Sequence, residues 1–178
     1  MPLFIREASP ADKAALLQVH VLAFGQDEES QLVDALLADP SAQPLLSLVA
    51  EDAGHVVGHV LLTHVELTGR ESAPAASILA PLAVLPSAQR AGIGRSLIEA
   101  SCERLAQRGV QLVFVLGDPS YYTRHGFRPA RPYGLRAPYA IEPEAAWMVR
   151  ALANDALGHC QGTIQCADAL RPERYWRE

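Results

Sequence analysis

A short segment rich in glycine and arginine is the part of the sequence best suited to bind an anion. It reads Gln89-Arg90-Ala91-Gly92-Ile93-Gly94, and Arg95 follows it. The segment lies between an apolar run typical of a strand and an amphipathic run typical of a helix. Unpaired N–H groups and the helix dipole make a helix start a site for a diphosphate, and glycines let the backbone come close to it. A plain turn ahead of a helix uses the same glycines, so the spacing alone leaves both interpretations open.

Two other phosphate-binding patterns do not fit this segment. Arg95-Ser96-Leu97 comes directly after Gly94, so the third glycine of a dinucleotide fingerprint is missing. The chain also lacks the P-loop pattern G-x-x-x-x-G-K followed by Ser or Thr. A diphosphate held by the backbone of the turn is the hypothesis that remains.

Histidines gather in the run from His55 to Leu67. In a strand, His55 and His59 would share one side, whereas His64 and Glu66 would share the other. Metal ligands must meet in one small shell, and no compact ligand spacing occurs here. We therefore expect no metal site, and mainly structural or surface roles for these histidines.

The apolar periodicity predicts alternating strands and helices. Ser9 and Asp12 form a capping pattern ahead of a helix over Lys13–Phe24. Asp52-Ala53-Gly54 joins two strands close enough for a hairpin, and Pro81 predicts a bulge because it cannot donate a ladder hydrogen bond. Further strands are expected at residues 3–7, 45–51, 55–67, 77–85, 110–116, from 127, 145–152 and 162–166, helices at 29–37, 92–108 and 120–125, a loop at 69–74, and a surface position for the Arg/Glu-rich end. This order predicts an α/β or α+β fold with one mixed sheet.

Composition favours one compact domain in a reducing compartment. The 178 residues are 49% hydrophobic and 20% charged, which suits a domain with a real core. A net charge of -5 argues against a nucleic-acid binder that relies on a basic face.

No apolar run approaches the ~20 residues that span a bilayer, and no signal-peptide pattern begins the chain, so we expect a cytoplasmic protein with no membrane partner. The three cysteines form no CxxC pair, which indicates neither a disulfide framework nor a zinc site; Cys102 and Trp147 are expected in the core.

The turn and its surroundings resemble the GNAT superfamily of N-acetyltransferases. The run Pro81-Leu82-Ala83-Val84-Leu85-Pro86 leads into residues 89–97, which are similar to the superfamily's central motif, Q/R-x-x-G-x-G/A after a Val-rich strand. Further on, Tyr121-Tyr122-Thr123-Arg124-His125-Gly126-Phe127 is similar to its second signature, an aromatic-Tyr-x-x-x-Gly-Phe stretch. Together the two motifs are more specific than either alone. The resemblance covers roughly residues 3–152, and residues 116–122 further resemble a bacterial branch of predicted N-acetyltransferases.

That resemblance implies a fold and a cofactor, acetyl-CoA. The fold would be a GNAT-like single domain over residues 1–178, with a core at 3–152 and a C-terminal extension at 153–178. Its mixed central sheet, flanked by helices, would hold the cofactor where the parallel strands Ile78–Leu85 and Val110–Leu116 splay apart. The implied cofactor-binding residues are Leu82, Ala83 and Val84 along the pantetheine arm, and Gln89, Arg90, Ala91, Gly92, Ile93, Gly94 and Arg95 around the pyrophosphate.

The resemblance also implies a reaction, in which a primary amine attacks the acetyl group directly within a ternary complex. Tyr122 matches the tyrosine that protonates the departing thiolate of CoA, and a phenol that titrates near pH 10 keeps its proton for this step. His64 and Glu66 are candidates for the general base, because GNAT bases often come from central strands. In this superfamily the region of Asp27-Glu28-Glu29 commonly lines the acceptor pocket, where acidic residues would attract an ammonium group. A solvated turn explains the same residues.

Several matters stay open at the level of sequence. The acceptor is a small-molecule amine or a protein amine, and the oligomeric state is a monomer or a homodimer. A CoA-binding sensor or regulatory module with little catalytic activity is the alternative function. An interaction domain that keeps only the fold is a third hypothesis.

Overall fold

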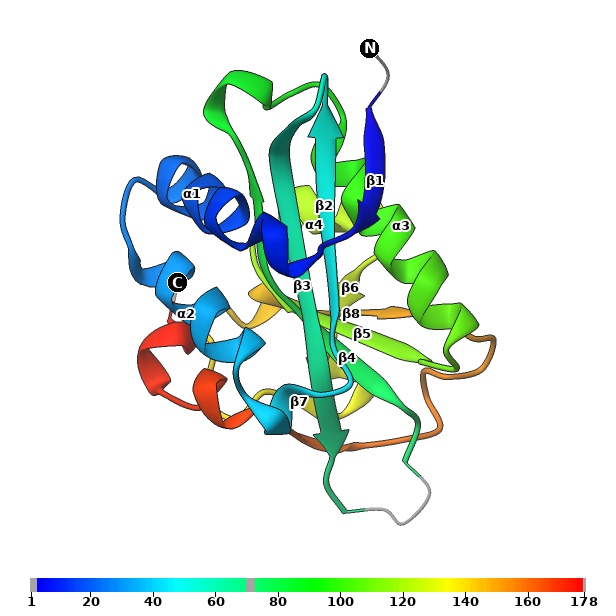
Figure 1. The fold of residues 1–178 in the computed structure, drawn as a ribbon. Coiled ribbons are helices and arrows are strands. Elements are labelled where there is room, and N and C mark those ends of the chain that lie inside the picture. The colour runs from blue at the N-terminus through cyan, green and yellow to red at the C-terminus, as the bar shows by residue number, and fades with distance from the viewer. Residues whose placement is uncertain (1–2, 70–72, 178) are drawn as a thin grey trace.

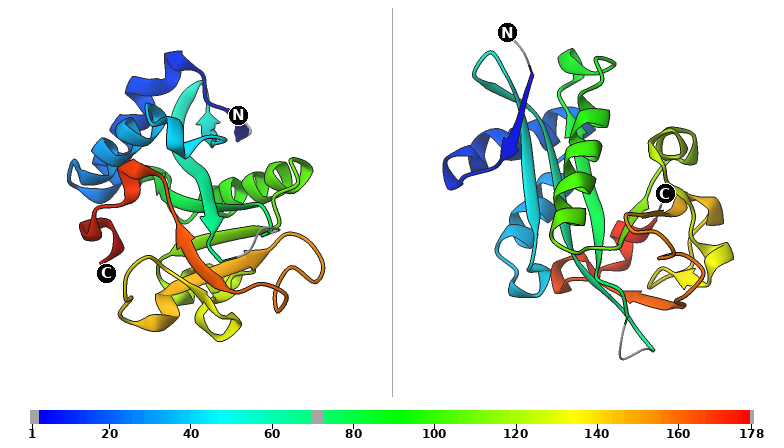
Figure 2. Two further views of the ribbon diagram at one scale, coloured as in Figure 1. Left: turned by 90° about the horizontal axis from the view of Figure 1, so that it is seen from below. Right: turned by 90° about the vertical axis from the view of Figure 1, so that its right-hand side faces the viewer.

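The computed structural model of the chain describes residues 3–69 and 73–177. In these residues, helices flank a mixed sheet on both faces (Figure 1, Figure 2). The helices are α1 (Lys13–Phe24), α2 (Glu28–Leu37), α3 (Ile93–Gln107) and α4 (Pro119–Tyr122). The strands are β1 (Phe4–Glu7), β2 (Leu46–Asp52), β3 (His55–Leu67), β4 (Ala76–Val84), β5 (Leu112–Leu116), β6 (Arg128–Pro129), β7 (Leu135–Arg136), β8 (Trp147–Ala151) and β9 (Gly162–Gln165).

The sheet has the strand order β1-β2-β3-β4-β5-β8-β6, and β9 joins it by pairing with β3 and with β7. β2 and β3 form the predicted antiparallel hairpin, whereas β4 and β5 pair in parallel. The α/β fold class with one mixed sheet is confirmed. Residues 70–72 of the loop expected at 69–74 lie outside the described residues.

The two faces of the sheet carry two apolar cores. One contains residues of α1 and α2, such as Leu16 and Leu36, and the other contains the apolar side of α3, with Leu97 and Ile98 fully buried. Burial of each such side chain stabilises the fold by about 1.5–3 kcal/mol. Cys102 and Trp147 are core residues, as expected. Burial raises the pKa of the Cys102 thiol to about 11.

The centre of the sheet changes its pairing around Pro81. Val60 pairs with Leu82 and Leu62 pairs with Leu79, so Leu61 faces two residues of β4, and the predicted bulge is confirmed. On the other side of β4, pairing with β5 ends at Leu79 and Val115. Beyond this point the parallel strands separate, which opens a gap in the sheet.

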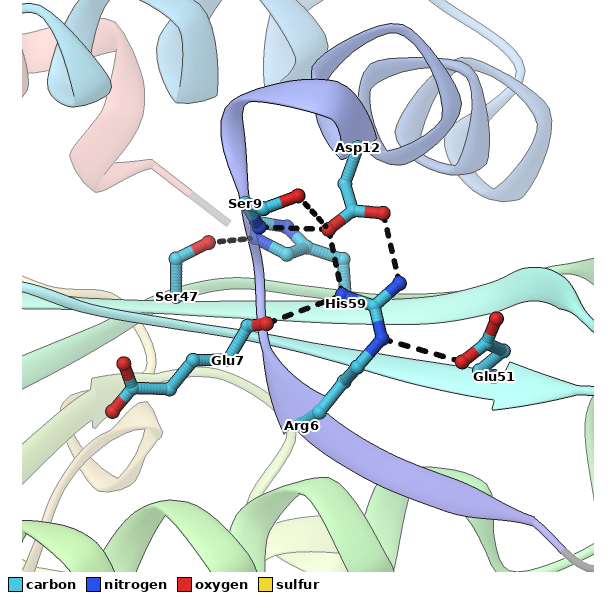
Figure 3. A network of polar contacts seen from close by, with 7 residues as sticks. All are labelled: Arg6, Glu7, Ser9, Asp12, Ser47, Glu51 and His59. Atoms are coloured by element: carbon cyan, nitrogen blue, oxygen red, sulfur yellow. Dashed lines mark hydrogen bonds and ion pairs between the residues drawn. The ribbon is translucent and has the colours of Figure 1, made fainter.

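The first strand is joined to the first helix by a network of charged groups (Figure 3). The Asp12 carboxylate accepts hydrogen bonds from the Arg6 guanidinium at 2.7 and 2.9 Å and from the Ser9 N–H at 2.7 Å. Arg6 also donates to Glu51 at 3.2 Å, which ties the network to β2. The hydrogen bonds from Arg6 hold the pKa of Asp12 well below its usual range. The predicted capping pattern of Ser9 and Asp12 is confirmed.

The C-terminal residues are part of the folded body. β9 pairs with β3, where Glu66 lies opposite Gln165. A last 3₁₀ turn, Glu173–Trp176, returns toward α2, and Trp176 is only 3% exposed. The expectation of a plain surface end is therefore wrong for Leu170 and Trp176, which join the core because their apolar side chains find a place between α2 and the sheet.

Candidate active site

The turn between β4 and α3 contains two residues with an unusual backbone conformation. Arg90 and Gly92 both adopt left-handed conformations, with φ of 64° and 82°. Such alternation makes a concave nest of N–H groups that suits an anion. The Ser96 N–H donates a helical hydrogen bond to the Gly92 carbonyl at 3.0 Å. The N–H groups of Ile93 and Gly94 come before this bond, in the first turn of α3, where N–H groups have no acceptor within the helix.

A cavity of about 660 Å³, which we term the turn cavity, opens beside this turn. It carries a cluster of positive charge from Arg90, Arg95 and Arg124. The remaining lining residues are Leu82, Val84, Ala88, Gln89, Gly92, Ile93, Gly94, Tyr121, Tyr122 and His125. An added Cβ at Gly92 would meet nothing within 4 Å, so the space above the turn is open. The cavity therefore fits a polyanionic ligand in an otherwise acidic protein.

Two tyrosines reach this cavity from α4, whose position is set by the residues before it. The Asp118 carboxylate caps the helix by accepting from the Ser120 N–H at 2.9 Å. Gly117 lies against the Tyr122 ring, where a Cβ would overlap the ring atoms. A Cβ at Gly94 would likewise overlap the Tyr121 hydroxyl, so the turn and α4 pack closely.

Arg150 of β8 fastens the 3₁₀ turn after α4, Thr123–His125, to α3. Its guanidinium donates to the Glu99 carboxylate at 2.9 and 3.3 Å and to the carbonyl of His125 at 3.0 Å. His125 is buried, and its ring packs edge-on against Tyr121 at 4.7 Å between centroids. Burial lowers the pKa of His125, which keeps this ring neutral near pH 7. The tyrosine-bearing segment is thereby held at both of its ends.

A second cavity, of about 360 Å³, lies on the other side of the gap between β4 and β5. We term it the tail cavity because the C-terminal residues form one of its walls. Glu28 and Glu29 line it from α2. The other lining residues are Phe24, Leu32, Ile78, Leu79, Ala80, Pro81, Leu82, Val115, Leu116, Gly117, Tyr122, Leu170, Arg174, Tyr175, Trp176 and Arg177. Most of these side chains are apolar, so the cavity suits a small organic molecule with a few charged groups.

Leu82 and Tyr122 line both cavities. The two cavities therefore lie side by side where the parallel strands separate, and Tyr122 is part of the wall of each. A ligand that extends from the turn along β4 would reach a second ligand in the tail cavity at this position.

The structure brings most of the predicted site residues together, with some exceptions. Ala83, Ala91 and Asp27 line neither cavity, although their neighbours do. The Nε2 atom of His64 lies 3.4 Å from a Glu66 carboxylate oxygen, so these two meet each other. Neither lines a cavity with Tyr122.

His59 has a structural role in the interior of the protein. Its Nε2 contacts the Ser47 hydroxyl at 2.8 Å (Figure 3), and its Nδ1 lies 2.8 Å from Nε2 of His20 on α1. Both rings are completely buried, and burial lowers both pKa values well below 6.5. The pair therefore joins α1 to the sheet as two neutral rings.

Sequence reasoning missed the residues that close both cavities. Arg124 and His125 lie inside the second signature, but the direction of their side chains depends on the 3₁₀ turn Thr123–His125 that follows α4. In the sequence, the aromatic pair Tyr175 and Trp176 was the signal that the C-terminal residues pack against the protein, because two adjacent large aromatic residues are unusual in a solvated end.

Among residues 3–69 and 73–177, no group of three or more His, Cys, Asp or Glu side chains is arranged to hold a metal ion. In that same part of the chain, no helix has both the length and the apolar character required to cross a membrane.

Comparisons with known proteins agree with this geometry. A model of the acetyltransferase (GNAT) domain matches residues 44–129. The chain is 44% identical over 161 residues to YjhQ, an uncharacterized N-acetyltransferase of Escherichia coli (strain K12), with 89% of this chain and 88% of that protein covered. The crystal structure of the GNAT family N-acetyltransferase YhbS from Escherichia coli in complex with CoA superposes with a TM-score of 0.85 at 32% identity, over 94% of this chain and 91% of that chain. A GNAT family acetyltransferase from Brucella melitensis in complex with acetyl-CoA gives a TM-score of 0.74 at 32% identity, over 95% of this chain and 98% of that chain.

The separation of the parallel strands β4 and β5, together with these matches, defines the chain as an acyltransferase. The chain belongs to the GNAT family of N-acetyltransferases. The resemblance seen in its two sequence motifs is confirmed.

Proposed function

We propose that the chain transfers the acetyl group of acetyl-CoA to a primary amine by direct attack within a ternary complex. One observation carries this proposal: Leu82 and Tyr122 line both the turn cavity and the tail cavity. Two ligands, one in each cavity, would meet at these residues. The CoA and acetyl-CoA bound to the related structures support the assignment of the turn cavity to the cofactor.

The residues of the turn fit the cofactor's pyrophosphate. The N–H groups between Gln89 and Arg95 would hold its oxygens, and Arg90, Arg95 and Arg124 would add positive charge. The backbone of Leu82 and Val84 follows the gap, where β4 still pairs with β3 but has no partner on its β5 side beyond Leu79, and would bind the pantetheine arm as an added strand. When bound, acetyl-CoA supplies an activated acetyl thioester.

The protein's own groups would then manage the charges and protons of the transfer. A backbone N–H of the Leu82–Val84 stretch polarises the thioester carbonyl. Glu28 or Glu29, directly or through water, takes the proton from the amine, whose nitrogen forms a bond to the carbonyl carbon. As the C–S bond breaks, Tyr122 donates its phenolic proton to sulfur and recovers one from solvent.

An assay of acetyl transfer tests this proposal. Purified protein is incubated with acetyl-CoA and a panel of amines of different charge and size, and CoA release and acetylated product are both measured. We expect product with at least one class of amine and stoichiometric CoA release. Tight acetyl-CoA binding without acetylation of any amine would contradict the proposal and favour a CoA-binding module.

A further inference from the structure

The C-terminal residues form a fixed wall of the tail cavity. The Ala169 N–H donates to Asp39 at 2.9 Å and the Asp168 N–H donates to the Ser41 hydroxyl at 2.8 Å, which ties this segment to the end of α2. Trp176 is buried and its indole N–H donates to the Leu170 carbonyl at 2.8 Å. These bonds fix the path of the chain that carries Arg174 and Arg177 to the cavity.

The charges around the tail cavity are mixed. Glu28 and Glu29 face it from α2, whereas Arg174 and Arg177 face it from the C-terminal segment. The Arg174 guanidinium lies 3.8 Å from the Glu28 carboxylate across the cavity rim. Two negative and two positive side chains leave no net charge to attract a simple cation. The expectation that acidic residues alone draw the acceptor is therefore incomplete.

Both arginine side chains are placed to bind an anionic group of a ligand. The side chain of Arg174 is 62% exposed, and that of Arg177 is 71% exposed with a 3.6 Å ion pair to Glu173. Exposed ion pairs of this kind contribute about 0–1 kcal/mol, so a ligand carboxylate can replace them at little cost. A guanidinium matches a carboxylate with two parallel hydrogen bonds, which makes arginine well suited to this role.

We propose that the acceptor is a small amino acid-like zwitterion whose carboxylate is bound by Arg174 and Arg177. This inference rests on the proposed function, and it names the substrate class. The amine lies toward Glu28, Glu29 and Tyr122. The apolar floor, which includes Leu32, Ile78 and Trp176, receives the apolar side chain of the acceptor. The cavity volume of about 360 Å³ suits an acceptor of this size.

The test compares pairs of acceptors with the same side chain, one with a carboxylate and one with a neutral amide in its place. Leucine is compared with leucinamide, and phenylalanine with phenylalaninamide, by kcat/KM for acetyl transfer from acetyl-CoA. The amine of each amide is less basic than that of the amino acid, so more of it is uncharged and able to attack at neutral pH. Intrinsic reactivity at neutral pH therefore favours the amides. We nevertheless expect the amino acids to be preferred by about tenfold or more, the effect of one charge-assisted hydrogen bond.

Variants assign the effect to the two arginines. The double variant Arg174→Ala, Arg177→Ala should raise KM for the amino acids by about tenfold and reduce their preference over the amides, measured by kcat/KM, by about the same factor. Arg171→Ala is the matched control, because Arg171 lies on the same segment, is exposed and lines neither cavity. It should leave the preference for the amino acids intact.

The possible failures are distinguishable. If the amides or other amines are acetylated and the amino acids are not preferred, the zwitterion proposal is wrong while acetyl transfer stands. If the double variant keeps the wild-type preference, the arginines do not bind the carboxylate, and the proposal is overturned. If no amine of any charge is acetylated, the proposed function and this inference both fail.

Discussion

Tyr122 connects the two cavities, and its phenol is the group we expect to act as general acid. Tyr122→Phe keeps the ring that packs against Gly117 and Phe127 and removes only the proton donor. We expect kcat to fall by about 10²- to 10⁴-fold, with little change in acetyl-CoA affinity or melting temperature. Steady-state and single-turnover kinetics measure the effect. A variant that keeps more than about half of kcat, with chemistry rate-limiting, would show that the thiolate leaves without help from Tyr122.

The neighbouring tyrosine is not a neutral control for this experiment. Tyr121 lines the turn cavity and its hydroxyl lies directly over Gly94, so Tyr121→Phe should change acetyl-CoA affinity. Tyr133→Phe is the better control, because Tyr133 lines neither cavity and its hydroxyl accepts from Arg128 at 3.1 Å. The sequence motif was enough to predict Tyr122, but the direction of Tyr121 depends on a helix of four residues that no periodicity can orient.

The acidic run also shows that sequence patterns do not predict the direction of single side chains. Asp27, Glu28 and Glu29 are adjacent in sequence, yet only the two glutamates line the tail cavity. Successive residues of a helix point in different directions, and the start of α2 relative to the sheet decides which of them face the gap. The resemblance to the GNAT superfamily implied acidic residues near the acceptor, but the arginines that balance them come from the far end of the chain.

At the scale of elements, α3 has a glycine with positive φ at each end. Gly92 has φ of 82° and Gly109 has φ of 86°, and an added Cβ would meet nothing within 4 Å at either position. Gly92→Ala and Gly109→Ala should therefore destabilise the fold by similar amounts, about 1–2 kcal/mol. Only Gly92→Ala should weaken acetyl-CoA binding, by about tenfold, because Gly92 lines the turn cavity and Gly109 does not.

Calorimetry with acetyl-CoA and denaturant unfolding of both variants give the two quantities separately. Equal affinities of the two variants for acetyl-CoA would mean that the turn does not hold the pyrophosphate. A comparable loss of stability in the two variants is the internal check that both substitutions introduce a similar backbone strain.

Long elements were predictable from sequence, and short ones were not. The strand His55–Leu67 and the helix Lys13–Phe24 have the predicted bounds, since long patterned runs specify their own structure. β5 begins at Leu112 instead of Val110, because the N–H groups of Gln111 and Leu112 both bond to the Ala75 carbonyl before the ladder starts. β6 and β7 have two residues each and exist only through pairing with distant strands.

At the scale of the whole molecule, the buried histidine pair should make stability depend on pH. His20 and His59 have pKa values well below 6.5 because burial disfavours their charged forms. Below pH 6.5 the unfolded chain binds more protons than the folded protein, so the free energy of unfolding must fall as pH is lowered. The slope is at most about 1.4 kcal/mol per pH unit for each histidine, and the loss continues until pH reaches the folded pKa values.

Urea unfolding at pH 7, 6 and 5 measures this slope, and His20→Phe should make it shallower whatever its effect on stability at pH 7. His55→Gln is the control, because His55 is exposed at the β2–β3 turn. A slope that is the same in His20→Phe as in the unmodified protein would contradict the assignment. The Asp12 carboxylate, whose pKa Arg6 holds low, affects stability at a lower pH and does not interfere.

The arrangement of the whole chain also explains why the tail was not predictable. Many contacts of residues 153–177 are with β3, α2 and the segment around Asp39, which precede them in the sequence by 95 residues or more. Such pairings follow from the tertiary fold, and neither motif reaches them. The wall of the tail cavity is therefore a property of the folded molecule.

The crystal structure of the chain with acetyl-CoA is the most direct test of the account. We predict that the pyrophosphate lies on the Gln89–Arg95 turn, that the pantetheine arm follows β4 beyond Leu79, and that the thioester sulfur lies within about 3.5 Å of the Tyr122 hydroxyl. The acetyl group should then face the tail cavity. A cofactor bound outside the turn cavity, or a sulfur beyond the reach of Tyr122, would contradict the proposed site.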